Sequence, residues 1–176
     1  MDFQELYKAD ACRYGKEWRA YERCFHYYFR KSQTYSKTPM KYWYRFMFNH
    51  LKNKRGIELS RNVQVGKGLF LCHSYNMTIN SGTVIGNNCN LHKGVTIGQE
   101  NRGPRKGAPT IGNEVWIGVN AAIVGNISIG NDVLIAPNSY VNCDVPDHSV
   151  VFGNPCIIKH RQNATDGYIN HIAPEA

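Results

Sequence analysis

The sequence of 176 residues contains no run of eighteen apolar residues, and its first residues, MDFQELYKADACRYGK, lack the apolar core of a secretory signal. We therefore expect no membrane-spanning helix and no export. The cysteines form no CxxC pair and no spacing typical of a zinc site. We predict that they are buried thiols in a reducing compartment, which indicates a soluble cytoplasmic protein. They are Cys12, Cys24, Cys72, Cys89, Cys143 and Cys156.

Glycine and proline are almost absent from residues 1–53, where only Gly15 and Pro39 occur. Aromatic residues recur in the first thirty residues at intervals of three and four, which predicts an amphipathic helix. Residues 38–56 predict a second helix, with Thr38 as its N-cap. The chain therefore begins with an α-helical segment.

Acidic residues are also scarce at this end of the chain. Residues 1–56 contain thirteen Lys and Arg against five Asp and Glu, whereas residues 57–176 contain eight of each. One interpretation is that the basic helices cover the end of the next domain. A second is that they touch a membrane surface where an acceptor is made. Nucleic acid is not expected as a partner, because no known binding motif accompanies the charge.

From residue 57 onward the sequence repeats with a period of six. This period fits neither an amphipathic helix nor an ordinary strand, but it fits coils of three short strands and three turns. We predict a left-handed parallel β-helix of hexapeptide repeats over residues 57–160, followed by a tail over residues 161–176. The aliphatic residues expected to form its inner columns are Leu59, Val65, Leu71, Ile79, Ile85, Leu91, Ile97, Ile111, Ile117, Ile123, Ile129, Ile135 and Val141.

Two insertions interrupt the repeat. Two extra residues lie between Leu71 and Ile79, and a long loop spans residues 99–110. A prism of stacked coils has no cavity of its own, and loops on a rigid scaffold often carry function. A tolerated surface insertion is the alternative. His73 in the first insertion and His92 one coil later are candidate bases, although a lone histidine on a strand is more often structural.

Residues 57–160 resemble the serine acetyltransferase family of hexapeptide acyltransferases, and they look closest to short members linked to surface-polysaccharide synthesis. The resemblance rests on the segment LCHSYNMTIN, on the loop length between VTIG and PTIG, and on the VWIG and GNP segments. It implies an acetyl-CoA-dependent O-acetyltransferase in which His73 is the general base. His92 stands where the family tolerates Gln. No nucleophilic cysteine is implied, and Cys72 is interpreted as a packing residue.

Two features of that family are missing. Cys72 replaces the Asp that precedes the catalytic His, and Lys106, Gly107 and Ala108 replace an Asp-Arg-His run in the loop. The lost Arg is the group that holds the carboxylate of an amino-acid acceptor. The acceptor hydroxyl therefore belongs to serine or to a sugar or polysaccharide precursor.

The resemblance also implies binding residues. Gly118, Val119, Ala136, Pro137 and Asn142 match the track of the pantetheine arm, and Lys159 and Arg161 are candidates for the nucleotide phosphates. Asp10 is a candidate for contact with the acceptor, and Arg102, Arg105 and Lys106 on the loop suit either the phosphates of acetyl-CoA or an anionic acceptor.

A different class of function stays open, namely a non-catalytic hexapeptide scaffold or assembly protein. A metal site of the γ-carbonic-anhydrase type is not expected, because such a site needs three converging histidines and residues 57–147 contain only His73 and His92. A single prism supplies one wall of a cleft, so we expect a homotrimer with sites between subunits. The short helical segment argues against a dimer of trimers.

Overall fold

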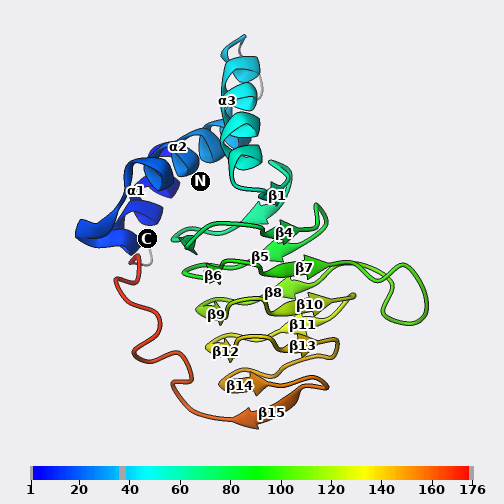
Figure 1. The fold of residues 1–176 in the computed structure, drawn as a ribbon. Helices are drawn as coiled ribbons and strands as arrows, with labels where there is room; N and C mark the ends of the chain where they lie inside the picture. Colours follow the sequence, from blue (N-terminus) through cyan, green and yellow to red (C-terminus); the bar gives the residue numbers. More distant parts are fainter. Residues whose placement is uncertain (1, 36–38, 175–176) are drawn as a thin grey trace.

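The computed structural model describes residues 2–35 and 39–174, and Thr38, the predicted N-cap, lies outside this range. Helices form one end of the molecule and a stack of short strands forms the rest (Figure 1). None of the described helices is long and apolar enough to cross a membrane. The helices are α1 (Phe3–Tyr14), the 3₁₀ turn η1 (Gly15–Glu17), α2 (Ala20–Thr34) and α3 (Met40–Lys54).

The first predicted helix is in fact two helices. Gly15 ends α1 with a φ of +52°, a conformation that glycine adopts without strain. The chain reverses through η1 before α2 begins. The spacing of aromatic residues continues across this break, because α1 and α2 each turn aromatic side chains toward the other, as in the edge-on contact between Phe3 and Tyr27. Periodicity alone therefore could not place the boundary.

The strands are two to four residues long and wind around three faces of a prism. They are β1 (Glu58–Leu59), β2 (Gln64–Val65), β3 (Phe70–Cys72), β4 (Thr78–Ile79), β5 (Val84–Ile85), β6 (Asn90–His92), β7 (Thr96–Gly98), β8 (Thr110–Ile111), β9 (Val115–Ile117), β10 (Ala122–Val124), β11 (Ser128–Ile129), β12 (Val133–Ile135), β13 (Tyr140–Val141), β14 (Ser149–Phe152) and β15 (Ile157–His160).

Successive strands belong to successive faces. Face A holds β1, β4, β7, β10 and β13; face B holds β2, β5, β8 and β11; face C holds β3, β6, β9, β12, β14 and β15. Neighbouring strands in each face are parallel except β14 and β15, which are antiparallel. This arrangement confirms the predicted parallel β-helix with an N-terminal helical segment.

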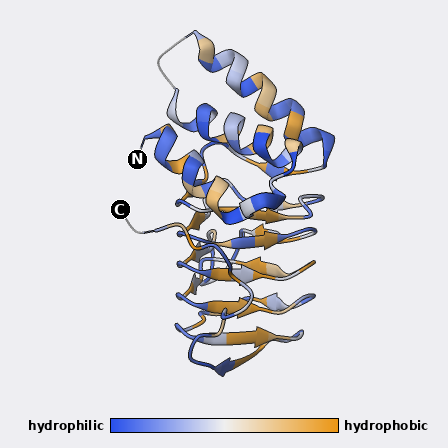
Figure 2. Ribbon diagram, turned by 90° about the vertical axis from the view of Figure 1, so that its left-hand side faces the viewer, coloured by the Kyte–Doolittle hydropathy of each residue, from blue (hydrophilic) through white to orange (hydrophobic). Residues whose placement is uncertain are grey.

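The six-residue period arises from the inner columns. In face A, Leu59, Ile79, Ile97, Ile123 and Val141 stand in register on consecutive strands. The predicted aliphatic residues on the other faces stack in the same way, and all thirteen are buried except Val65, which is half-buried on the first coil. The column stabilises the stack because each coil buries apolar area against its neighbours. Figure 2 shows these apolar strands one above another.

Both insertions lie at the corners that flank face A. The two extra residues fall in the turn from β3 to β4, at the corner between faces C and A. The long loop falls between β7 and β8, at the corner between faces A and B, and it projects away from the prism (Figure 1). Within the loop, the backbones of Glu100 and Gly107 pair at 2.9 and 3.0 Å.

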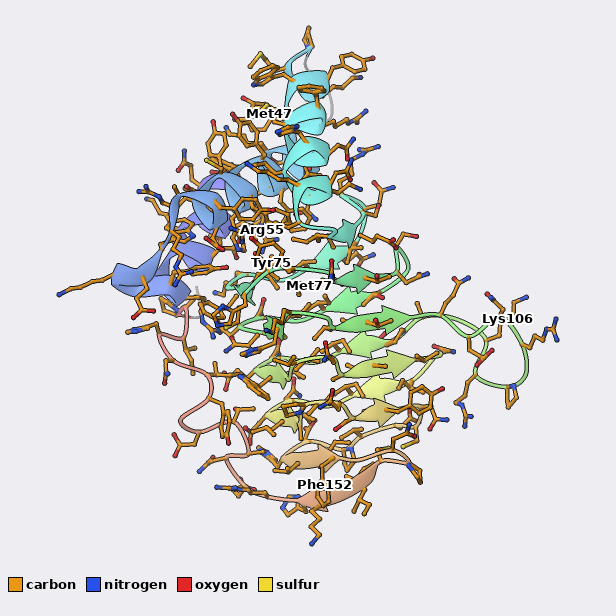
Figure 3. The ribbon with its side chains drawn as sticks, viewed as in Figure 1. Met47, Arg55, Tyr75, Met77, Lys106 and Phe152 are labelled. Carbon is orange, nitrogen blue, oxygen red and sulfur yellow. The ribbon has the colours of Figure 1, made fainter. Side chains whose placement is uncertain are left out.

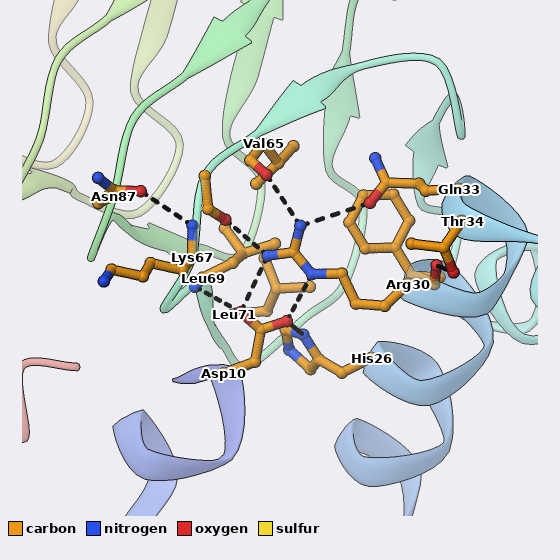
Figure 4. A network of polar contacts seen from close by, with 12 residues as sticks. Asp10, His26, Arg30, Gln33, Thr34, Val65, Lys67, Leu69, Leu71 and Asn87 are labelled. Carbon is orange, nitrogen blue, oxygen red and sulfur yellow. Dashed lines mark hydrogen bonds and ion pairs between the residues drawn. The ribbon is translucent and has the colours of Figure 1, made fainter. Parts of the chain in front are cut away.

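A buried ion pair joins the helical segment to the first coil (Figure 4). Asp10 on α1 and Arg30 on α2 are both fully buried, and two of their N–O distances are 2.8 and 2.9 Å. Burial disfavours the charged carboxylate, but the Arg30 guanidinium and the His26 ring outweigh it and lower the pKa of Asp10 to about 2. Asp10 therefore stays ionised inside the protein.

The same pair satisfies backbone groups of the first coil. Asp10 accepts the N–H of Leu69 at 2.9 Å, and Arg30 donates to the carbonyls of Val65 and Gly66 at 2.9 and 2.7 Å. Val65 and Gly66 lie at the end of β2, and Leu69 directly precedes β3. Each of these two strands has a neighbouring strand on one side only, so the backbone groups at its other edge need hydrogen-bond partners. The helices thus seal the end of the β-helix, which supports the first interpretation of the basic segment.

The tail runs back along the prism from the last strand to the helices (Figure 1). Asp132 fixes its start by accepting the N–H groups of Ala164 and Thr165, each at 2.9 Å. Near its end, Ala173 donates its N–H to Asn88 at 3.0 Å. The tail is therefore tied both to the coil that contains β12 and to the coil that contains β6.

The prediction of buried cysteines is wrong for most of them. Only Cys89 is buried, while Cys12 and Cys24 are exposed on the outer sides of α1 and α2. The remaining three are half-buried. The helices of residues 3–54, which we call the cap, each have one side facing solvent. A small side chain such as cysteine is tolerated on that side.

We predict that Asp10→Asn destabilises the protein. The substitution leaves Arg30 as a buried charge without its carboxylate, which costs about 3–5 kcal/mol of unfolding free energy. Urea unfolding at fixed protein concentration measures the change. Asp166→Asn is the control, because Asp166 is exposed on the tail. Equal midpoints for the two variants would contradict a structural role for the Asp10 pair.

Candidate active site

A cleft of about 770 Å³ lies where the helices, face C and the tail meet. Its walls come from the α1–η1 junction, the start of α2, the end of α3, strand β3 with its turn, and residues 168–171 of the tail. The volume is in the range of pockets that hold small molecules. The cleft exists because the prism is supplemented by helices and tail, which the repeat alone does not supply.

Arg13 holds three walls of this cleft together. Its guanidinium donates to the carbonyl of Asn88 at 2.9 Å, to Oδ1 of Asn90 at 2.6 Å, and to the carbonyl of Asn170 at 3.1 Å. These partners belong to the prism and to the tail, whereas Arg13 belongs to α1. The side chain is buried, so the cleft is a built feature of the fold.

His73 lies at the rim of the cleft, in the turn with the two extra residues. It is exposed, and its φ of +50° is unusual for a residue with a side chain. Within residues 2–35 and 39–174, no hydrogen bond to another residue holds the ring. The predicted base is therefore accessible, and its direction is set by the backbone of the turn.

His92 occupies the next coil, where it pairs with Cys72 across the two strands of face C. Its ring packs against Trp116, with 4.6 Å between the ring centroids. Burial, helped by the nearby His73, lowers the pKa of His92 to about 4. A base works best with a pKa close to the operating pH, so His92 is the weaker candidate of the two.

Cys72 is half-buried beside His73 and lines the cleft. Burial raises the pKa of its thiol, and Arg19 only partly offsets this effect. The neutral thiol is a poor nucleophile, because the thiolate is the reactive form. The geometry thus agrees with a packing residue.

Four of the five residues predicted for the pantetheine track share one corner with His73. Gly118 and Val119 follow β9, and Ala136 and Pro137 follow β12, so both pairs lie at the corner between faces C and A. The coils touch closely here, since a Cβ on Gly118 would come within 2.6 Å of the Pro137 nitrogen. Small side chains therefore line the corner between faces C and A on the coils that follow the coil of His73.

The other residues predicted to bind acetyl-CoA lie elsewhere. Asn142 follows β13 and stands at the corner between faces A and B. Lys159 and Arg161 are exposed at the far end of the prism, where Arg161 donates its backbone N–H to the His148 carbonyl at 2.7 Å. In a single chain these three residues do not extend the track beside His73.

The predicted acceptor residues also separate in space. Arg102, Arg105 and Lys106 are exposed on the loop at the opposite edge of face A from His73, and Figure 3 shows Lys106 projecting outward. They do not line the cleft of their own chain. Asp10 is fully buried with both carboxylate oxygens engaged, so we assign it a structural role.

The sequence did not identify the charged residues that line the cleft, of which Arg55 and Glu22 lie beside the turn of His73. Arg55 donates to Glu22 Oε1 at 2.9 Å and to Ser74 Oγ at 3.0 Å, so it lies directly beside the turn of His73. The second oxygen of Glu22 is buried without a hydrogen-bond partner among the described residues. Their positions in the helical segment carried no motif, and Arg55 counted only as part of the basic charge at the end of the second helix.

Comparison with known proteins supports the same family as the motifs. The family model described as bacterial transferase hexapeptide (six repeats) matches residues 108–143. A serine acetyltransferase of Synechococcus elongatus is 32% identical over 116 residues, which are 66% of this chain and 48% of the relative. A serine acetyltransferase of Helicobacter pylori is 36% identical over 99 residues, 56% of this chain and 58% of the relative.

A solved serine acetyltransferase structure from Neisseria gonorrhoeae superposes with a TM-score of 0.71 at 26% identity, covering 96% of this chain and 70% of that chain. This chain is a hexapeptide-repeat protein similar to serine acetyltransferases. The serine acetyltransferase-like chain spans about half the length of the curated relatives that it matches. The structural match extends over the helices as well as the coils, so the cap belongs to the shared fold.

We predict that His92 weakens the serine acetyltransferase-like fold in acid. A folded pKa of about 4, below the ordinary value of 6.5, means that the unfolded chain binds a proton that the folded chain excludes. The free energy of unfolding should therefore fall as the pH drops from 6.5 toward 4. His92→Gln should make this fall shallower in thermal unfolding at a series of pH values.

His50→Gln on the exposed side of α3 is the matched control, and we expect it to leave the pH dependence unchanged. If His92→Gln and the wild type lose stability in parallel across this window, the shift assigned to His92 is wrong.

Proposed function

We propose that the protein is an acetyl-CoA-dependent O-acetyltransferase in which His73 is the general base. One observation carries the proposal: His73 is exposed at the rim of a cleft, on the same corner of the prism as Gly118, Val119, Ala136 and Pro137, which we call the Gly118–Pro137 corner. The similarity to serine acetyltransferases supports the reaction class. We infer that the enzyme acts in the cytoplasm, and six free cysteines agree with a reducing compartment.

The proposed reaction is a direct transfer between the two substrates. His73 takes the proton of the acceptor hydroxyl as its oxygen attacks the thioester carbonyl of acetyl-CoA. A carbon–oxygen bond forms, the carbon–sulfur bond breaks, and the proton passes from His73 to the departing thiolate of CoA. The small residues at the corner suit a co-substrate arm that lies along the backbone. No covalent acyl-enzyme is required, in agreement with the neutral thiol of Cys72.

Serine is the acceptor that the similar proteins suggest. The size of the cleft favours a second candidate, the hydroxyl of a sugar or polysaccharide precursor, because about 770 Å³ exceeds what serine fills. The cations Lys16 and Arg19 on its walls offer polar contacts to either acceptor. Release of free thiol from acetyl-CoA, with serine against a set of nucleotide sugars, separates the two.

The central prediction concerns His73. His73→Ala should lower kcat by about 10²–10⁴, the usual worth of a positioned general base, with little change in acetyl-CoA binding. His92→Gln should retain most of the turnover, since the neighbouring ring is the poorer base. Steady-state kinetics and calorimetric titration with acetyl-CoA measure the two effects.

If the His73 variant turns over normally while the His92 variant does not, the base lies one coil further along. If neither acetyl-CoA binding nor turnover of any hydroxyl acceptor is found, the alternative of a non-catalytic scaffold is preferred.

We further propose a homotrimer in which the loop of one subunit completes the site of the next. The loop cations Arg102, Arg105 and Lys106 are exposed and do not line the cleft of their own chain, so we assign them to the site of a neighbouring subunit. The exposed aromatic residues Tyr42, Trp43 and Phe46 on α3 offer a surface for assembly. A contact of residues 1–56 with an anionic membrane is the other use of this surface, since α3 carries several Lys and Arg and no acidic residue.

Complementation tests the shared site. Inactive His73→Ala subunits, refolded in equal amounts with inactive subunits that lack residues 101–105, should regain activity, because about a quarter of all sites pair an intact His73 with an intact loop. Light scattering should give the mass of a trimer. An active monomer would refute the proposal, and salt-sensitive binding of the wild type to anionic vesicles would assign the α3 surface to a membrane instead.

A further inference from the structure

The turn that carries His73 is held in an unusual conformation. His73 and Asn76 have φ angles of +50° and +49°, in the left-handed region that side chains disfavour. Such residues persist only where their surroundings hold them in place, and they concentrate at functional sites. Asn76 stands at a corner position that is also left-handed in the later coils, at Gly94, Asn120 and Asn138, whereas His73 belongs to the two-residue insertion. The regular corner bonds of the repeat therefore account for Asn76 but not for the inserted residues His73 and Ser74.

Arg55, just after α3, makes three contacts with this turn. Its carbonyl accepts the N–H of Asn76 at 2.9 Å. Its Nη1 donates to Ser74 Oγ at 3.0 Å, and Ser74 is buried. The guanidinium lies 4.6 Å from the ring centroid of Tyr75, and Figure 3 shows these two residues together between the helices and the first coil. The three residues directly after His73 thus all contact Arg55.

Arg55 is itself fixed by α2. Its guanidinium lies 3.4 Å from the ring centroid of Tyr21, and its Nη1 donates to Glu22 Oε1 at 2.9 Å. Tyr21 is tied to α3 through a hydrogen bond from its hydroxyl to the Leu51 carbonyl at 2.8 Å. A guanidinium clamped between two rings and a carboxylate has little freedom, and a lysine cannot reproduce this planar geometry.

We propose that Arg55, acting through Ser74, is the positioning residue for His73. This inference rests on the proposed function, in which His73 is the base. Cys72 precedes His73 in place of a carboxylate, and the ring has no hydrogen-bond partner in the described part of the chain. The orientation of the imidazole is therefore imposed through the backbone of residues 73–76, and Arg55 fixes that backbone from the helical cap.

The test uses two conservative variants, Ser74→Ala and Arg55→Lys, in the full-length protein. Each should lower kcat by about 10- to 100-fold, since small misplacements of a catalytic group cost rates of this order. The KM and calorimetric affinity for acetyl-CoA should stay near the wild-type values, because the Gly118–Pro137 corner lies on later coils. Rates are measured with serine, or with the nucleotide sugar that the acceptor screen selects. Arg23→Lys, on the exposed side of α2, is the control and should keep the wild-type kcat.

The same substitutions in a His73→Ala background distinguish positioning from general damage. If Arg55 acts through His73, neither substitution lowers the residual rate further, as expected for residues that work as a unit. A further loss of similar size in that background would make Arg55 merely structural and overturn the proposal. Wild-type kcat for both single variants, alongside an inactive His73→Ala, would also overturn it. Normal turnover of His73→Ala itself would instead refute the proposed function.

Discussion

The buried pair of Asp10 and Arg30 is the interaction on which the arrangement of the cleft depends. A β-helix ends in strand edges whose N–H and carbonyl groups need partners, and this pair supplies them to Val65, Gly66 and Leu69. Two charges without water are stable only with such complete bonding. Once the pair is docked, α1 and α2 have one position on the first coil. That position decides which side chains face His73.

The cap therefore does more than seal an end. Stacked coils make a solid prism, because their inner columns are filled by aliphatic side chains and their faces are flat. A binding site therefore has to be built on the outside, from elements that the repeat does not contain. Here the walls come from the helices and from the tail, and Arg13 links both to the prism. The two-residue insertion then turns His73 toward the space enclosed by them.

The sequence predicts the repeated coils well and the walls of the cleft poorly, because only the coils leave a periodic pattern. The inner columns and the insertions were predictable, because each coil repeats the same local pattern, and His73 stood out by its position in an insertion and by resemblance. The contacts of Asp10 and Arg55 were not predictable, since they join segments tens of residues apart and leave no period in the sequence. The similarity of Asp10 to a family residue predicts a contact with the acceptor. Burial against Arg30 and His26 gives it a different role.

Cys72 stands where the resemblance leads us to expect an acidic residue that orients the histidine, and in the proposed mechanism the cap takes over this orienting role. A carboxylate beside the histidine would orient the ring directly, through one hydrogen bond. In its absence the ring is directed by a strained turn, and the turn is directed by a guanidinium from the helical segment. Orientation through backbone needs a rigid support, which the aromatic clamp of Tyr21 and Tyr75 provides. In the proposed mechanism the site thereby couples its base, His73, to the docking of the helices, so a substitution that loosens the helical segment should lower turnover before it unfolds the prism.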